Sequence, residues 1–388
     1  MKNAGATIVK LIGSEVCGST LSLSCNSPIT DKDLAEMYSI AKKHDIAHIL
    51  SSALINNGLL TASAMENVYR EQVYSTLYRY ENQCYAFDKV CDVLEKEKIK
   101  YIPLKGAVIK EIYPQPWMRT GCDIDILVHE EDVQKAADAI AYSLGYAKKG
   151  MGKHDIQILS TENIYVELHF TLLEEDASPA MAKVLAKAWD YATPCEDGVY
   201  RHEFSDAMFY FYHIAHMAKH FTGGGCGIRP FLDLWLMENN KNYGAAETTA
   251  LLKKAKLTDF AKSASKLSRV WFSGEEHDKV TKIMEEFIFS GGSFGSTETI
   301  MLSEQQKAGG RIKHILSRIF IPYDDLKGQY PIIKKYKFLT PICEICRIFT
   351  LIFGKRKNFR KNYIGKLKSV PDEHLEYIDY LFKKTGFK

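Results

Sequence analysis

The sequence contains few cysteines, nine among 388 residues, and their number is odd. So low a content excludes a scaffold held together by disulfides and favours free thiols in a reducing compartment. The single Cys-x-x-Cys pair, Cys343 and Cys346, has no second pair and no His-x-x-x-His nearby to complete a zinc site. The opening apolar run over residues 6–12 is interrupted by Lys10 and is too short for the core of a signal peptide. We therefore expect a cytoplasmic protein.

Internal repeats, low-complexity tracts and membrane-spanning hydrophobic runs are also lacking. Hydrophobic residues make up 46% and charged residues 26% of the chain, which is typical of globular proteins and excludes disordered, fibrous and multi-span membrane proteins. The apolar stretch 338–353 carries Glu344 and Arg347 and is too short and too polar to cross a bilayer. Neither glycine cluster, at 223–225 and 291–295, is followed by Lys-Ser or Lys-Thr, so the sequence has no P-loop.

A large excess of charge of either sign is lacking, because the formal net charge is only +3. That balance excludes nucleic-acid binding by bulk positive charge. The distribution is uneven, however, since residues 331–388 contain 14 Lys and Arg against 5 Asp and Glu. For this basic region we favour a helix over 338–353 that packs on the body and leaves a basic face in solvent. The alternative is contact with a membrane surface or an acidic partner, helped by the basic residues at 355–357 and 360–361.

The order of the hydrophobic patterns predicts an α+β protein, with a small mixed-sheet domain embedded in a mostly helical chain. Helical periodicity covers residues 31–97, with Asp31 or Asp33 as the cap, and returns after about residue 178. Between them, the predicted elements are strands at 123–128, 155–159 and 164–170, a helix at 131–144 and a hairpin turn at 161–163. The expected regions are an N-terminal helical region (1–98), a sheet domain (99–175), a helical domain (176–330) and a basic C-terminal helical region (331–388).

Two aspartates at the start of the predicted strand 123–128 are the most informative feature. Residues two apart in a strand point to the same face, so the side chains of Asp123 and Asp125 project together. Adjacent carboxylates repel unless a cation lies between them, and oxygen ligands favour Mg²⁺ or Mn²⁺. Glu167, on another predicted strand, could complete a two-metal site, and His169 shares its face. The alternative is the polar face of an exposed strand, although Asp is depleted in strands.

A glycine upstream of the Asp pair is the second feature. Gly106 follows an apolar run and precedes a helix-like segment. A strand, a glycine turn and a helix N-terminus present backbone amides to phosphate. Lys105 and Arg119 flank this predicted pocket and would bind a triphosphate, Arg119 through its bidentate guanidinium. The alternative for both is a solvated charge on a surface loop.

These residues give the chain a resemblance to the nucleotidyltransferase superfamily of the DNA polymerase beta type. The pattern in that superfamily is an apolar residue, Gly and a small residue, then two acidic residues on a strand and a later acidic residue. More closely, the chain resembles the bacterial uncharacterised nucleotidyltransferase family, over roughly residues 35–350. The segments that carry this resemblance are Leu104-Lys-Gly106, Tyr113-Pro114, Arg119, Asp123-Ile-Asp-Ile-Leu-Val128, Gly145-Tyr146, Glu167-Leu-His169, then His216, Lys219, His220, Arg229, Asp233 and the glycines at 291–295.

The resemblance implies catalytic and metal-binding roles for Asp123, Asp125 and Glu167. The residues that it assigns to nucleotide and phosphate binding are Lys105, Gly106, Arg119, His169, His216, Lys219, His220, Arg229 and Asp233. It also implies that the helices carrying the later residues close the nucleotide cleft against the sheet. In the superfamily a Ser usually follows the glycine and its hydroxyl touches phosphate, whereas this chain has Ala107.

Other interpretations of the histidine-rich helix stay open. His213, His216 and His220 share a helical face, but no cysteine or carboxylate is spaced to make zinc the favoured ligand. The aromatic residues at 209–212 equally predict a core helix. His169, on the predicted strand 164–170, could orient Glu167 or an acceptor, or be a structural histidine.

The sequence therefore predicts a metal-dependent nucleotidyltransferase that moves a nucleoside monophosphate from an NTP, with ATP favoured, to an acceptor hydroxyl. Pyrophosphate is the expected leaving group. Ala107 motivates one alternative, a non-catalytic nucleotide-binding or regulatory module. The basic C-terminal region motivates another, an enzyme that adds nucleotides to RNA, so nucleic acid stays open as a partner. Peripheral membrane contact is not favoured, and neither the acceptor nor the oligomeric state is assigned.

Overall fold

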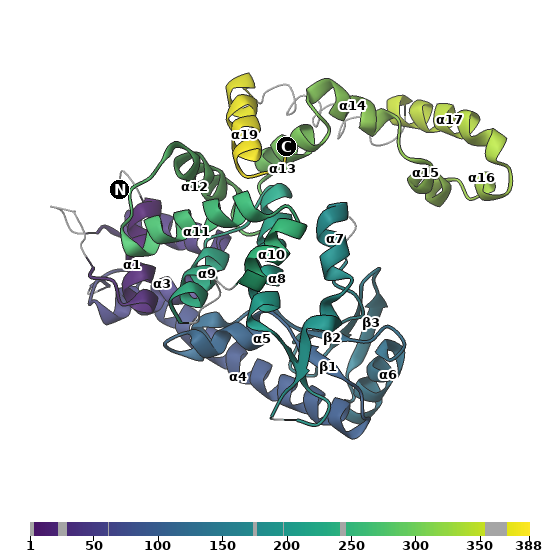
Figure 1. Ribbon diagram of the computed structural model, residues 1–388. Coiled ribbons are helices and arrows are strands. Elements are labelled where there is room, and N and C mark those ends of the chain that lie inside the picture. Colours follow the sequence, from purple (N-terminus) through teal and green to yellow (C-terminus); the bar gives the residue numbers. More distant parts are fainter. Residues whose placement is uncertain are drawn as a thin grey trace.

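The computed structural model describes residues 4–21, 29–60, 62–173, 177–196, 198–240, 246–353 and 371–388. The fold is α+β, as predicted, with helices around a five-stranded mixed sheet and a separate two-stranded ribbon (Figure 1). The cysteines in the described part of the chain are all free thiols. The basic residues 355–357 and 360–361 lie outside the described residues.

Helices form the described chain before the sheet. They are α1 (Ala4–Cys17), α2 (Asp31–Lys43), α3 (Ala47–Asn56) and α4 (Glu66–Lys96). The cap of α2 differs from the prediction: the hydroxyl of Thr30 accepts from the Asp33 backbone at 3.2 Å, and Asp33 accepts from the Thr30 backbone in return. The sequence did not predict α1, whose apolar residues Ile8, Leu11 and Ile12 are fully buried in the helical core.

The sheet brings together strands that the sequence separates. They are β1 (Tyr101–Pro103), β2 (Asp123–Val128), β3 (Ala147–Met151), β4 (Asp155–Leu159) and β5 (Tyr165–His169), in the order β1-β2-β5-β4-β3. The central pair β2–β5 is parallel and the other pairs are antiparallel. The predicted hairpin of β4 and β5 is confirmed. The sequence missed β3, since its residues are all exposed and lack an apolar alternation.

The two faces of β2 have different partners because successive side chains alternate. Ile124, Ile126 and Val128 pack in a core with residues of α4 and of α6 (Val133–Leu144). Asp123 and Asp125 point to the opposite face, where they line a cavity together with residues of α8 (Asp206–Thr222). The sheet therefore has one apolar face, which packs against α4 and α6, and one acidic face at the front, which lines the cavity.

Most of the second half of the chain is helical, as predicted. It contains α7 (Pro179–Leu185), β6 (Ala192–Pro194), β7 (His202–Phe204), α8, α9 (Arg229–Asn240), α10 (Ala246–Lys254), α11 (Thr258–Ser273), α12 (Lys279–Gly291) and α13 (Thr297–Lys307), with a 3-10 turn at Ala188–Tyr191. Helix α8 lies inside this part, and its residues Phe211, Ile214, Met217 and Phe221 are fully buried.

The two glycine clusters meet although they are about seventy residues apart in sequence. A Cβ atom on Gly225 would lie 2.1 Å from the backbone nitrogen of Gly295. The backbone of Gly227 donates to the carbonyl of Gly292 at 2.9 Å. The glycines therefore permit a close contact between the α8–α9 and α12–α13 connections.

The chain then leaves the body as a C-terminal arm, residues 311–353 (Figure 1). The arm consists of α14 (Arg311–Ile319), α15 (Tyr323–Gln329), α16 (Ile332–Lys335), the 3-10 turn η4 (Lys337–Leu339) and α17 (Thr340–Phe353). Helix α19 (Asp372–Lys384) returns to the body against α12 and α13. The predicted packing of residues 338–353 on the body is wrong, because α17 contacts α15 and η4 instead. Among the described residues, no helix has the length and apolarity needed to cross a membrane.

Candidate active site

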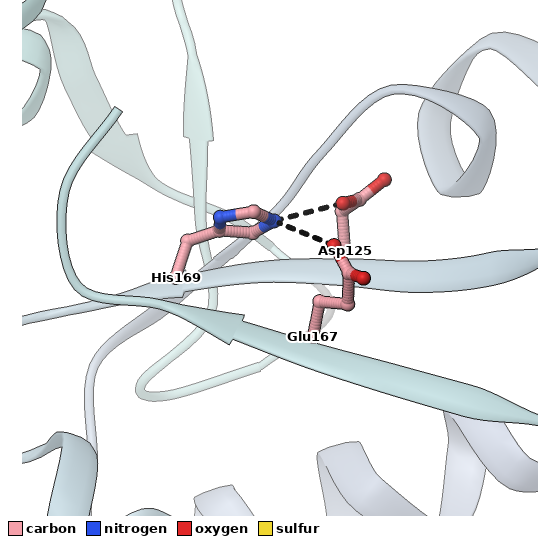
Figure 2. Close-up of side chains that lie close together, drawn as sticks. All are labelled: Asp125, Glu167 and His169. Carbon is pink, nitrogen blue, oxygen red and sulfur yellow. Dashed lines mark hydrogen bonds and ion pairs between the residues drawn. The ribbon is translucent and has the colours of Figure 1, made fainter. Parts of the chain in front are cut away.

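Acidic side chains gather on the front of the sheet. Asp123 and Asp125 lie on β2, and Glu167 is the register partner of Asp125 on the parallel strand β5. His169 follows two residues later on β5, so it shares the face of Glu167. Figure 2 shows the side chains of Asp125, Glu167 and His169 pointing toward one another. The structure thus brings together the residues that the sequence placed on separate predicted strands.

Asp125 is the most enclosed of these acids, with 5% of its surface exposed. Its Oδ1 atom accepts from Nζ of Lys105 at 3.1 Å and lies 2.8 Å from Nε2 of His169. The same His169 nitrogen is 3.6 Å from Oε2 of Glu167. Gln157 of β4 donates to the other oxygen of Glu167 at 3.3 Å. His169 therefore bridges the two strands, and Lys105 supplies the positive charge next to Asp125.

The carboxylates differ in their electrostatic surroundings. Asp123 lies exposed at the mouth of the cavity, yet desolvation by the cavity walls raises its pKa, and the charge of Asp125 raises it further. Burial, followed by the charges of Asp125 and Asp123, also raises the pKa of Glu167. Burial alone would raise the pKa of Asp125 as well, but Lys105 and His169 outweigh it and hold the pKa below its usual range. At Asp123 and Glu167 the repulsion from neighbouring carboxylates is therefore not fully offset by the nearby positive charges.

This donor set fits a divalent cation. One ligand atom each from Asp125, Glu167 and His169 lie within 4.8 Å of one another, and Asp123 adds a carboxylate on the same face. A cation would relieve the repulsion that raises the pKa values of Asp123 and Glu167. Carboxylate oxygens are the ligands that Mg²⁺ and Mn²⁺ prefer.

Lys105 reaches Asp125 from a strained backbone position. Its φ is +45° and its ψ is −116°, a combination that non-glycine residues rarely adopt. It precedes the single helical turn α5 (Gly106–Ile109), which continues into the 3-10 turn η1 (Lys110–Ile112). A Cβ atom on Gly106 would lie 3.2 Å from Nη1 of Arg119, so the glycine lets the guanidinium approach the turn. The strain and the close approach place both basic groups beside the acidic strand.

Arg119 is buried rather than solvated on a surface loop, so that alternative is wrong. It ends the 3-10 turn η2 (Pro116–Arg119) and is only 9% exposed. Its Nε donates to Oδ1 of Asp233 at 2.7 Å, and the hydroxyl of Tyr113 donates to the same oxygen at 2.6 Å. Two residues assigned to nucleotide binding, Arg119 and Asp233, are thus bound to each other and link η2 to α9.

A second ion pair holds the start of α9. Arg229 pairs with Asp45, and its Nη1 donates to the carbonyl of Thr120 at 3.3 Å. Thr120 follows η2, and two residues separate it from the start of β2. The Arg119–Asp233 pair and the bond from Arg229 to Thr120 attach α9 to the segment that leads into the acidic strand, and the Arg229–Asp45 pair attaches it to the connection between α2 and α3.

Helix α8 lies across the cavity from the sheet. Nε2 of His213 lies 2.9 Å from the carbonyl of Pro230, so His213 contacts the start of α9. The Nε2 atoms of His216 and His220 are 3.2 Å apart. Burial, then the charge of Lys105, holds the pKa of His216 well below its usual value, which leaves a neutral imidazole facing the acids. Among the described residues the three histidines do not form a metal-ligating group.

A cavity of about 300 Å³ opens between the sheet and α8. Every residue of the predicted site lines it, namely Lys105, Gly106, Arg119, Asp123, Asp125, Glu167, His169, His216, Lys219, His220, Arg229 and Asp233. Asp123, Asp125, Glu167 and His169 line the cavity from the sheet, and Lys219, His216 and His220 line it from α8. Such a cavity suits a polyanion held by a cation.

The cavity also has walls that the sequence did not predict. Gln83 of α4 donates to the carbonyl of Asp123 at 3.2 Å, and Tyr80 and Phe87 line the cavity beside it. The ring of His154 stacks on that of His169, with centroids 6.0 Å apart. For Tyr80 and Phe87 the sequence carried only a weak signal, a seven-residue spacing that places both on one face of a helix.

Tyr212 is another residue that sequence reasoning assigned only to the core. It lies one turn before His216 on α8 and lines the cavity. Burial raises its pKa to about 12, so its hydroxyl stays protonated. The four-residue spacing from His216 could have identified it.

Comparison with known proteins gives one family and one structural match to report. A family model described as an uncharacterised nucleotidyltransferase matches residues 30–273. No curated protein matches the chain. A solution structure of the antibiotic-resistance factor ANT(2'')-Ia matches with 11% sequence identity, over 50% of this chain and 92% of that chain, at a TM-score of 0.27. So low a score carries no weight for the fold, which rests on the elements described above.

Proposed function

Because the chain belongs to the uncharacterised nucleotidyltransferase family, we propose that it transfers a nucleoside monophosphate from an NTP, with ATP favoured, to an acceptor hydroxyl. The acceptor oxygen forms a bond to the α-phosphorus, the bond to the bridging oxygen breaks, and its electron pair leaves with pyrophosphate. The observation that supports this reaction is the pairing of Asp125 with Glu167 at the cavity, beside Asp123 and Lys105. Catalysis of this kind depends on positioning and on neutralisation of charge.

Asp123, Asp125 and Glu167 are the residues that would hold the divalent cations, Mg²⁺ or Mn²⁺. Bound there, a cation would neutralise triphosphate oxygens and favour the deprotonated form of the acceptor hydroxyl. Glu167 either completes the site nearest the acceptor or takes the proton of the acceptor hydroxyl. His169 orients the carboxylates of both strands, since its Nε2 lies 2.8 Å from Asp125 and 3.6 Å from Glu167.

The basic residues divide into two groups under this proposal. Lys105 and Lys219, with His216 and His220, bind the phosphates from the walls of the cavity. Arg119 and Arg229 already pair with Asp233 and Asp45. We therefore assign to this second group the placement of α9 and of the start of β2, so that the helical region 176–330 closes the nucleotide cleft.

The test is transfer of label from each α-labelled NTP to a lysate fraction or a defined acceptor, with Mg²⁺ or Mn²⁺ present. We expect labelled product and pyrophosphate, and loss of both on addition of EDTA. Asp125→Asn and Glu167→Gln should lower the rate at least about 100-fold without unfolding the protein. Each change removes a carboxylate charge that holds the cation and so helps to stabilise the transition state. Asp92→Asn, an exposed acid on α4, is the matched control and should keep full activity. Full activity in Asp125→Asn would refute the proposal.

Ala107 favours a second candidate, a nucleotide-binding module without transferase activity. It lines the cavity at the position where the superfamily places a phosphate-binding Ser. Titration calorimetry separates the two functions, since tight NTP binding without pyrophosphate release across many acceptors would favour the module. Ala107→Ser should then tighten NTP binding without producing turnover.

A further inference from the structure

The C-terminal arm has exposed apolar side chains. The arm extends away from the sheet that carries the candidate active site (Figure 1). On α17, Ile342, Ile345 and Phe349 are 56%, 54% and 60% exposed. Phe338, just before this helix, is 74% exposed. The spacing of three and four residues places Ile342, Ile345 and Phe349 on one face of α17, and Phe338 lies in the 3-10 turn η4 that precedes it. This face is an apolar stripe directed outward.

Helix α14 and the residue that follows it carry a second stripe. Ile312, Leu316 and Phe320 are 75%, 47% and 58% exposed and follow one another at intervals of four residues. His314, on the other side of the helix, is 3% exposed and lies 3.6 Å from Glu304 of α13. His314 thus lies on the inner side of α14, while the stripe of Ile312, Leu316 and Phe320 faces solvent.

Specific contacts fix the orientation of α17. Cys343 and Arg347 form the inner face of α17 and are both buried. Arg347 donates to the carbonyls of Ile319 and Arg318 at the end of α14, and its Nε lies 3.1 Å from Glu344. Because these bonds anchor α17 to α14 from the inside, the outer stripe cannot turn inward without breaking them. Exposed apolar surfaces of this kind mark sites of interaction.

Basic residues accompany the stripes. Lys334, Lys335 and Lys337 are all exposed and alternate with exposed apolar residues. Those neighbours are Ile332, Tyr336 and Phe338, which are 53%, 42% and 74% exposed. Over residues 311–353 the sequence has eight Lys and Arg against three Asp and Glu. Lysines next to aromatic and aliphatic side chains are typical of segments that lie in the interface of a bilayer.

We propose that the C-terminal arm binds the surface of an anionic phospholipid membrane. The stripes of α14 and α17 enter the boundary between headgroups and acyl chains, and the three lysines contact lipid phosphates. A second copy of this chain fits less well, because it would bring two surfaces of the same positive charge together. Nucleic acid fits less well, since exposed Ile and Leu have no counterpart on a phosphate backbone. The structure thus favours the membrane contact that the sequence ranked second.

The test is co-sedimentation of the full chain with vesicles of phosphatidylcholine alone or mixed with phosphatidylglycerol. We expect binding to the anionic vesicles at least about tenfold tighter than to the neutral ones, and weaker binding as salt screens the lysines. Ile345→Glu with Phe349→Glu should lower the affinity at least about tenfold, and so should Lys334→Glu with Lys335→Glu and Lys337→Glu. These side chains are exposed, so the variants should fold and keep NTP binding.

The controls are exposed residues outside the arm. Tyr142→Glu, at a side chain that is 93% exposed on α6, and Lys149→Glu, on β3, should leave vesicle binding unchanged. Phe338→Trp adds a reporter whose emission should shift to the blue only with anionic vesicles. Equal binding by the arm variants and wild type would overturn the proposal. So would a dimer in sedimentation velocity that Ile345→Glu with Phe349→Glu dissociates, or tighter binding to RNA than to vesicles.

Discussion

At the scale of single residues, Asp233 shows how a charged side chain serves structure and site together. It is 1% exposed, and one of its oxygens accepts from both Arg119 and Tyr113. Burial would raise its pKa, but Arg119 and His213 outweigh that effect and hold the pKa below its usual range. A buried arginine that loses its carboxylate is left with an uncompensated charge.

Asp233→Asn should therefore destabilise the protein strongly. We expect the free energy of unfolding to fall by about 3–5 kcal/mol, because Arg119 would remain buried without a counter-charge. Tyr113→Phe removes only one hydrogen bond and should cost about 1 kcal/mol. Urea denaturation followed by tryptophan fluorescence measures both. Wild-type stability in Asp233→Asn would contradict the pairing and leave Asp233 available to a nucleotide.

At the scale of elements, the α8–α9 connection and the α12–α13 connection both depend on glycine. Gly224 has a φ of +106° and Gly295 a φ of +84°, which other residues rarely adopt. Gly225 lies so close to the backbone of Gly295 that a Cβ atom cannot be accommodated without movement of one connection. The ends of α8 and α12 are thus held at a fixed separation above the cavity, where Ser293 and Phe294 form part of its lining.

Gly225→Ala should test this contact. The added Cβ would lie 2.1 Å from the nitrogen of Gly295, so we expect a loss of about 1–3 kcal/mol in the free energy of unfolding. Gly328→Ala is the matched control, because it is inside α15 and, in the part of the chain that the structure describes, no atom beyond its chain neighbours and its own helix backbone lies within 4 Å of its Cβ position. That change should be neutral or stabilise by up to about 1 kcal/mol. Equal melting temperatures for Gly225→Ala and wild type would show that the connections do not meet.

At the scale of the whole molecule, buried histidines make the fold sensitive to acid. His48 is 4% exposed, and its Nε2 lies 2.8 Å from the carbonyl of Met118, so this nitrogen carries the hydrogen. Burial lowers its pKa to about 4, and burial lowers the pKa of His44 to about 4 as well. Between pH 6.5 and 4 the unfolded chain binds protons that the folded chain does not, so stability falls as the pH falls through this range.

His48→Gln should flatten this dependence. Each such histidine contributes a slope of about 1.4 kcal/mol per pH unit between its folded and unfolded pKa values. Removal of one should therefore reduce the slope of the free energy of unfolding by that amount between pH 6 and about 4.5. Urea denaturation at a series of pH values gives the slope. His374→Gln, at an exposed position on α19, is the control, and an unchanged slope in His48→Gln would argue against a buried neutral His48.

Local patterns were sufficient for the acidic strand. The two-residue period of 123–128 predicted both the strand and the shared face of Asp123 and Asp125, and the structure has β2 over Asp123–Val128. The helix and hairpin that follow are confirmed, and they bring Glu167 beside Asp125. Capping was less predictable, because Thr30 rather than an aspartate is the N-cap of α2. The strand β3 had no apolar alternation to reveal it.

The sequence alone thus predicted the fold class and the acidic face, because these follow from periodicities of two and of about 3.6 residues. The other residues that line the cavity were implied by the resemblance to a family and not by any local period. The tertiary structure decided which charges are paired and which surfaces face outward. Arg119 and Asp233 are 114 residues apart, and no local pattern joins them. Helix α17 is amphipathic by sequence, but only its bonds to the end of α14 direct the apolar stripe into solvent. Ion pairs between distant residues and the direction in which a helix face points depend on which helices and strands pack together. These contacts form only in the folded chain, so no local sequence pattern reveals them.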